Sequence, residues 1–224
     1  MESSQARDLS DICPVSGQSY FEDLVCARLQ AFGLMLAVAG AATMIALAGV
    51  YGDARQVVAT SIYGATLILV YGSSALYHFA RDPTRKRVLK TVDHAIIHLL
   101  IAGTYTPFVL VTLQGGWGWS LFGVVWGLSV VGMALKVFAG DRFRILPLLI
   151  YLGMGWVGVV AAVPLFDKLG LGGVLWMVLG GSIYSAGVIF YLWDRLRFNH
   201  LVFQMFVLGG SVCFYFAIMF NVLF

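Results

Sequence analysis

The chain has 224 residues, of which 60% are hydrophobic and 11% are charged, and its formal net charge is +3. Soluble domains carry about 25% charged residues, so this composition excludes an ordinary soluble domain. No basic stripe and no CxxC pair occurs, which argues against nucleic acid as a partner and against a thiolate zinc site. Residues 1–28 are polar and lack the basic-then-apolar form of a cleavable signal, so we expect the first apolar block to act as a signal anchor.

Seven apolar blocks follow this polar segment, and each has about the 20 residues that a helix needs to cross a bilayer core. Apolar residues run continuously through the blocks, which favours helices over the alternating pattern of barrel strands. The expected spans are residues 29–51, 58–80, 93–113, 117–138, 146–166, 174–193 and 200–223. The sequence therefore predicts an all-α membrane protein, a seven-transmembrane helical bundle with an N-terminal segment over residues 1–28 and one membrane domain over residues 29–224.

The Lys and Arg residues predict the orientation of this bundle, because cytoplasmic loops are enriched in positive charge. Twelve of the 14 Lys and Arg residues fall on the side of the N-terminus, and only Arg55 and Lys168 fall on the other side. Trp117 and Trp119 begin the fourth span on the sparsely charged side, as interfacial aromatic anchors should. We therefore expect a cytoplasmic N-terminus and, after seven crossings, a C-terminus outside the cell.

Two short features predict contacts between helices. The connection at residues 114–116 is very short, so the third and fourth spans should be antiparallel neighbours. Gly123 and Gly127 have the GxxxG spacing that lets two membrane helices approach closely. We interpret these two glycines as packing residues rather than as part of a binding site.

Ionisable side chains inside membrane spans are costly, so they are the first candidates for a functional site. The histidines of the chain all lie in or at the ends of spans, and the predicted orientation places all of them at cytoplasmic depth: they are His78, His94, His98 and His200. Asp93 starts the third span at the same depth. Segments far apart in the sequence thus bring polar groups to one level of the bilayer. This agreement is independent of the predicted orientation, because the charge count behind that prediction does not include the histidines.

Helical spacing pairs further polar residues with two of these histidines. Ser74 precedes His78 by four residues and Gln204 follows His200 by four, so each pair shares one helix face. Imidazole is the commonest biological zinc ligand, and a carboxylate such as Asp93 can complete or orient a zinc site. A zinc ion with an open position would lower the pKa of its bound water to about 7 and so supply hydroxide.

Other interpretations of these residues are open at this point. Histidines near a membrane interface can simply hydrogen-bond lipid headgroups or the backbone, and a serine on a helix often bonds to a carbonyl of the preceding turn. Ser74 and His78 can also form a Ser–His dyad. No GxSxG-type elbow accompanies that pair, and a single helix offers it no evident oxyanion hole.

Three stretches at these positions resemble the hemolysin III family, the bacterial branch of the progestin and adipoQ receptor family. The stretches are SSALYH at residues 73–78, DH at 93–94 leading into LLIAGTYTPF at 99–108, and residues 200–213, which begin with His200 and end with VLGGSVC at 207–213. With seven spans and a cytoplasmic N-terminus, the resemblance covers nearly the whole chain. The stretch at 99–108 is its most specific part.

The resemblance implies a zinc site on the cytoplasmic side, with His78 and His200 as ligands and with Ser74 and Asp93 holding the zinc-bound water. Gln204 stands where the family has a second histidine of the last span, and a neutral amide oxygen is a far weaker zinc ligand than imidazole. Three outcomes follow for this chain: Gln204 ligates zinc weakly, His98 compensates for it, or zinc is absent.

The resemblance supports one main hypothesis, a zinc-dependent hydrolase that cleaves a lipid amide within the membrane, because receptors of the family resemble ceramidases. Asp93 would then act as general base and Ser74 would position the water. The alternative is a non-enzymatic membrane protein that is pore-forming and hemolytic, lipid-sensing or signalling, and a secondary transporter is the least favoured function. The expected partner is membrane lipid, and the short loops and the resemblance favour a bacterial inner (plasma) membrane as the location.

Overall fold

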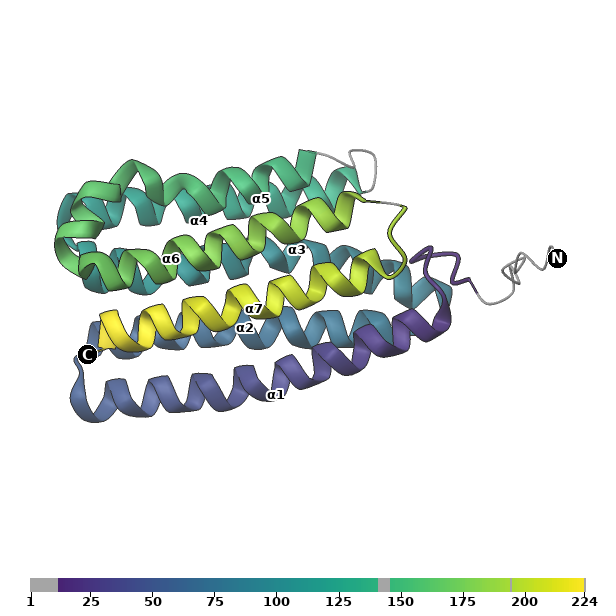
Figure 1. The fold of residues 1–224 in the computed structure, drawn as a ribbon, viewed down its shortest axis with the longest axis horizontal. Helices are drawn as coiled ribbons and strands as arrows, with labels where there is room; N and C mark the ends of the chain where they lie inside the picture. Colours follow the sequence, from purple (N-terminus) through teal and green to yellow (C-terminus); the bar gives the residue numbers. More distant parts are fainter. Residues whose placement is uncertain (1–11, 141–145, 194, 224) are drawn as a thin grey trace.

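The computed structural model describes residues 12–140, 146–193 and 195–223, and the regular elements within these ranges are all helical. In chain order they are α1 (Tyr20–Tyr51), α2 (Ala54–Phe79), α3 (Pro83–Pro107), η2 (Phe108–Leu113), α4 (Gly115–Ala139), α5 (Leu146–Trp156), η3 (Val157–Ala161), α6 (Ala162–Leu192), α7 (Asn199–Ile218) and η4 (Met219–Leu223). Figure 1 shows the long helices side by side in one bundle, which confirms the predicted all-helical class. Three residues of the predicted charge count, Arg7, Arg142 and Arg144, lie outside the described residues.

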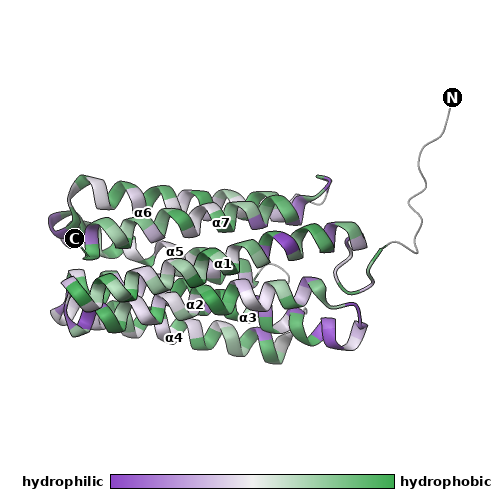
Figure 2. Cartoon of the chain, turned by 90° about the horizontal axis from the view of Figure 1, so that it is seen from below, coloured by the Kyte–Doolittle hydropathy of each residue, from purple (hydrophilic) through white to green (hydrophobic). Residues whose placement is uncertain are grey.

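The bundle has the surface of a membrane protein. Within the described ranges, six helical stretches are long and apolar enough to cross a membrane. Large apolar side chains cover the outside of the bundle, among them Phe32, Met35, Leu69, Val130, Leu149 and Ile189. Figure 2 shows apolar residues along the helices and hydrophilic residues mainly toward the ends. Apolar surface of this extent belongs in lipid, so the chain is a multi-pass membrane protein.

The fifth of these stretches, Leu146–Leu192, has 47 residues and combines α5, η3 and α6. Gly170 divides α6, because its φ of 65° and ψ of −173° are not helical. Glycine suits this position since it has no Cβ to clash at positive φ. Figure 1 shows the chain turning back within this stretch, and Trp156 and Ser185, on either side of Gly170 in the sequence, are joined by a hydrogen bond of 3.1 Å. The same figure places the start of α1 and the end of α7 at opposite ends of the bundle.

Two helices begin well before the apolar blocks in which they continue. α1 begins at Tyr20, because the side chain of Ser19 caps its first turn in a capping box. α3 begins at Pro83, preceded by the capping side chain of Asp82. Asp93, which the hydropathy pattern places at the start of a span, therefore lies about three turns inside α3.

Close packing on the inner side of the bundle depends on small residues. A Cβ added at Gly103 of α3 would stand 2.8 Å from Thr66 Cγ2 of α2. α3 and α4 pack against each other as the short connection predicts. A Cβ at Gly123 or Gly127 would meet no atom of the described chain within 4 Å. The interpretation of these two glycines as packing residues within the bundle is therefore wrong, because GxxxG spacing does not specify which helix face points to a neighbour.

We predict that Gly103→Ala lowers the stability of the purified protein, since the added methyl group forces Thr66 away from α3. Overpacking of this kind costs about 1–3 kcal/mol, which thermal unfolding in detergent detects as a lower Tm. Gly123→Ala is the control, because open space surrounds its Cβ and alanine is favoured over glycine in a helix by about 0.5–1 kcal/mol. An unchanged Tm for Gly103→Ala would contradict the close contact between α2 and α3.

Candidate functional site

Two histidines and one glutamine meet at one end of the bundle. His78 stands at the end of α2, and His200 and Gln204 lie in the first two turns of α7. The Nε2 atoms of the two histidines are 3.3 Å apart, and the Gln204 side-chain nitrogen lies 2.7 Å from His78 Nε2 and 3.0 Å from His200 Nε2. The structure thus brings the three predicted ligands into direct contact.

The beginning of α7 aligns the side chains that this helix contributes. Phe198 precedes the helix in a left-handed conformation with a φ of 62°. The Asn199 side-chain oxygen accepts a hydrogen bond from the His200 backbone N–H at 2.8 Å. Because Gln204 follows His200 by four residues, both side chains then extend from one face of α7 toward α2.

A buried carboxylate supports His78 from the other edge of its ring. Asp23 Oδ1 lies 2.9 Å from His78 Nδ1, and Asp23 Oδ2 lies 2.6 Å from Lys86 Nζ. Ser16 Oγ donates a further hydrogen bond of 3.0 Å to Oδ2. The side chains of Asp23, His78 and Lys86 are at most 3% exposed, so an ion pair is buried where α1, α2 and α3 meet.

Asp23 and Lys86 are site residues that the sequence did not predict. The polar composition of residues 1–28 assigns Asp23 to a segment outside the membrane domain, and Lys86 counts only as a loop charge. One signal could have revealed Asp23. The capping box at Ser19 starts a helix early, and Asp23 and Gln30, seven residues apart, then fall on its buried face.

Asp93 and Ser74 face each other beside this cluster. Ser74 lies one turn before His78 in α2, Asp93 comes from α3, and their side chains lie close to each other. Both are buried, and both line the cavity that also contains His200 and Gln204. The pair predicted to hold a water therefore lies at the same end of the bundle as the three predicted ligands.

The other two histidines make different contacts. His94 Nδ1 donates a hydrogen bond of 2.7 Å to the backbone carbonyl one turn earlier in α3. His98 is fully buried against Gly132 of α4, and its ring centroid lies 4.4 Å from that of Tyr151 in α5. His98 thus packs toward α4 and α5 rather than beside Gln204.

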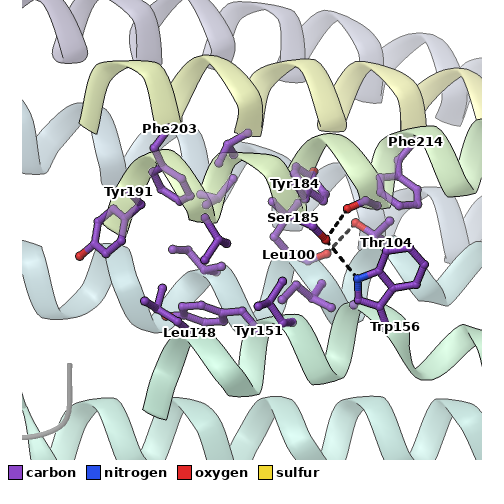
Figure 3. Close-up of a pocket in the computed structure, with 18 of the residues that line it drawn as sticks. Leu100, Thr104, Leu148, Tyr151, Trp156, Tyr184, Ser185, Tyr191, Phe203 and Phe214 are labelled. Atoms are coloured by element: carbon purple, nitrogen blue, oxygen red, sulfur yellow. Dashed lines mark hydrogen bonds between the residues drawn. The ribbon is translucent and has the colours of Figure 1, made fainter. Parts of the chain in front are cut away.

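A cavity of about 570 Å³ extends from the polar cluster between α3, α5, α6 and α7. Its volume lies within the range of about 300–1,000 Å³ that small-molecule sites have. Beyond the polar end its walls are mainly apolar and aromatic, and Figure 3 shows side chains around this space, among them Leu148, Tyr151, Tyr191, Phe203 and Phe214. A chamber of this kind can hold an elongated amphiphile with its polar group at the histidines.

The donors that could ligate a metal here are two imidazoles and one carboxamide. Among the described residues, no group of three or more His, Cys, Asp or Glu side chains is arranged to hold a metal ion. Zinc binding at His78, His200 and Gln204 therefore stays a prediction, and it depends on an amide as the third and weakest donor.

Comparison with known proteins gives a family that extends over nearly the whole chain. A family model described as "Haemolysin-III related" matches residues 20–215. The chain is 40% identical over 202 residues to Hemolysin-3 of Bacillus cereus, covering 90% of this chain and 92% of that protein. It is 38% identical over 199 residues to the Hemolysin-3 homolog of Bacillus subtilis strain 168 (89% and 93%), and 23% identical over 223 residues to the Monocyte to macrophage differentiation factor of Homo sapiens (95% and 90%). The resemblance found in the sequence is confirmed, and this protein belongs to the hemolysin III family.

Proposed function

We propose that this protein is a zinc-dependent hydrolase of lipid amides, with its site at the cytoplasmic end of a seven-crossing bundle in a bacterial plasma (inner) membrane. The observation that carries the proposal is the contact of His78, His200 and Gln204 at the polar end of an apolar cavity. Potential ligand atoms and space for a lipid thus adjoin each other.

The proposed topology has the N-terminus in the cytoplasm and the C-terminus outside. The 47-residue stretch Leu146–Leu192 has room for two crossings, because about 20 helical residues suffice for one. The chain turns back within this stretch at Gly170, and α1 starts at the opposite end of the bundle from the end of α7 (Figure 1). The excess of Lys and Arg at the end where α1 starts supports a cytoplasmic position for that end, and hence for the polar site.

The donor geometry supports a zinc ion between α2 and α7. Zinc–nitrogen bonds of about 2.0–2.1 Å in a tetrahedral site place two ligand nitrogens about 3.3 Å apart. The Nε2 atoms of His78 and His200 have this separation. Gln204 Oε1 is buried and has no hydrogen-bond partner among the described residues. A half-turn of the amide would exchange this oxygen with the nitrogen that faces both imidazoles, and so would supply a third donor.

The polar residues have distinct roles in this proposal. A zinc ion bound by His78, His200 and Gln204 would polarise a carbonyl and lower the pKa of a coordinated water to about 7. Asp93 is the group that accepts the proton of the attacking water and then gives it to the amide nitrogen as the C–N bond breaks and the amine leaves. Ser74, which lies beside Asp93, positions this water, and the burial of both residues shields the proton transfer from bulk water.

The cavity supports a lipid as the substrate. Its apolar walls suit an acyl chain, and its polar end carries the donors that a headgroup amide would meet. The rings of Tyr191 and Phe203 each have their centroid 6.0 Å from that of His200, so aromatic side chains border the histidine on the way into the apolar part. Membrane lipid is therefore the proposed partner.

A second candidate function is permeabilisation of membranes without hydrolysis. The observation in its favour is the 40% identity to a Bacillus cereus protein named Hemolysin-3. Under this alternative the contacts of His78 with α7 and with Asp23 would serve only to hold three helices together.

The topology is tested by cysteine labelling in a background in which the three native cysteines are replaced by serine. We expect a membrane-impermeant maleimide added to intact cells to label Gly116→Cys, because the predicted fourth span starts on the outside. Arg85→Cys should react only after the cells are opened, because the proposed topology places residue 85 on the cytoplasmic side. Both positions are exposed on the bundle, so burial does not explain a difference in labelling. The reverse pattern would mean that the bundle has the opposite orientation.

Zinc binding is tested by metal analysis of the purified protein. We expect zinc in the native chain, none in His78→Ala, and at least about tenfold tighter binding in Gln204→His, because imidazole is a stronger zinc ligand than an amide. Gln114→His, at an exposed position outside the cluster, is the control and should bind like the native chain. Equal zinc content in His78→Ala, Gln204→His and the native chain would show that the ion does not bind at this cluster.

Hydrolysis and leakage are measured on one preparation, vesicles containing an N-acyl sphingosine and an encapsulated dye. We expect release of free fatty acid without dye, and a loss of about 10²–10⁴-fold in rate for Asp93→Asn, since general base catalysis contributes that much. Asp53→Asn is the matched control, because asparagine also caps α2 at this exposed position. Dye release without fatty acid would support the second candidate and exclude the hydrolase.

A further inference from the structure

We propose that Asp23 is a positioning residue that holds His78 in the tautomer whose Nε2 lone pair faces His200 and Gln204, and that Lys86 keeps the Asp23 carboxylate in place. The inference rests on the proposed zinc site, because it names the group that keeps one ligand ready to bind. Asp23 comes from α1, a helix that supplies no ligand to the site.

The contacts of Asp23 leave its carboxylate little freedom. Oδ1 bonds to the His78 ring, at 2.9 Å from Nδ1. Oδ2 accepts hydrogen bonds from Lys86 Nζ at 2.6 Å and from Ser16 Oγ at 3.0 Å. Lys86 is 1% exposed, and its Nζ stands 5.3 Å from the centroid of the Tyr77 ring. The charge of Asp23 is therefore paired where it stands, as a buried carboxylate requires.

These partners determine which ring nitrogen of His78 carries the hydrogen. An ionised carboxylate accepts hydrogen bonds and donates none, so Nδ1 must carry the hydrogen that bonds to Asp23. A neutral imidazole has a single N–H, which leaves Nε2 with its lone pair. The position of the Gln204 side-chain nitrogen, 2.7 Å from His78 Nε2, agrees with this tautomer, because an amide N–H donates a hydrogen bond to such a lone pair. Metal-binding histidines commonly donate the N–H of the ring nitrogen that does not bind the metal to a carboxylate or a carbonyl.

Asparagine at position 23 separates positioning from simple packing, because it has the shape of aspartate but only one acceptor oxygen. Lys86 Nζ is a donor only and is buried, so it takes the amide oxygen. The amide nitrogen then faces His78 Nδ1, which must accept, and the ring hydrogen moves to Nε2. Asp23→Asn therefore inverts the tautomer. In the double variant Asp23→Asn with Lys86→Met the amide oxygen is free for His78, and the original tautomer returns.

The tautomer is measured by nitrogen NMR of isotope-labelled histidines in zinc-free protein in lipid nanodiscs. A pH about two units above the ordinary imidazole pKa of about 6.5 keeps the rings neutral, and His78→Ala identifies the His78 signals. We expect an unprotonated Nε2 in the native chain, an unprotonated Nδ1 in Asp23→Asn and an unprotonated Nε2 in the double variant. Glu22→Gln is the matched control, since it makes the same change one residue away and retains the capping box.

Zinc affinity from competition with a chelator is the second readout. We expect it to fall by about 10–100-fold in Asp23→Asn, as for other residues that orient a ligand, and to recover in the double variant. Glu22→Gln should bind zinc like the native chain.

The outcomes distinguish this proposal from the zinc site on which it rests. A His78 tautomer that is the same in the native chain and in Asp23→Asn overturns the positioning role, even if zinc binds. A native chain that binds no zinc, yet shows the expected tautomer changes, overturns the zinc site and supports the role of Asp23. If Asp23→Asn fails to fold, the native spectrum decides, because a protonated Nε2 there overturns the proposal.

Discussion

A bilayer core offers no water to the backbone, and the structure of this protein follows from that constraint. Backbone N–H and C=O groups must find partners within the chain, so each crossing is helical. Polar side chains are then tolerated in the bundle only where other elements pair with them. Here the polar residues of α1, α2, α3 and α7 meet at one end, while large apolar side chains cover the outside.

The buried pair of Asp23 and Lys86 connects helix packing to the chemistry of the site. Moving two charges out of water costs several kcal/mol for each ion, and the 2.6 Å contact between them offsets that cost. The same carboxylate holds the ring of His78. Asp23 of α1 and Lys86 in the first turn of α3 are therefore linked by direct contacts to the His78 side chain of α2.

Gln204 gives this chain a site that differs from the histidine pattern that the family resemblance implies. Its amide nitrogen lies within hydrogen-bond distance of both His78 and His200, so it can bond to both imidazoles without an ion, whereas its Oε1 has no hydrogen-bond partner among the described residues. A bound zinc ion would have to replace these hydrogen bonds with ligand bonds, one of them from an amide oxygen. The proposed site should consequently bind zinc less tightly than a site with three imidazoles.

The sequence by itself determined that the chain is helical, that it belongs in a membrane and that it is a member of the hemolysin III family, because hydropathy and short motifs act within one segment. It also singled out His78, His200 and Gln204, because histidines in spans are unusual, because Gln204 follows His200 by one helical turn, and because the family resemblance places zinc ligands at these positions. Only the tertiary structure revealed that Asp23 bonds to His78 and to Lys86, which lie 55 and 63 residues further along the chain. It also decided that the GxxxG pair of α4 packs against no neighbouring helix in the described chain. Such contacts depend on how each helix rotates and tilts against the others, and no pattern within a single helix encodes that arrangement.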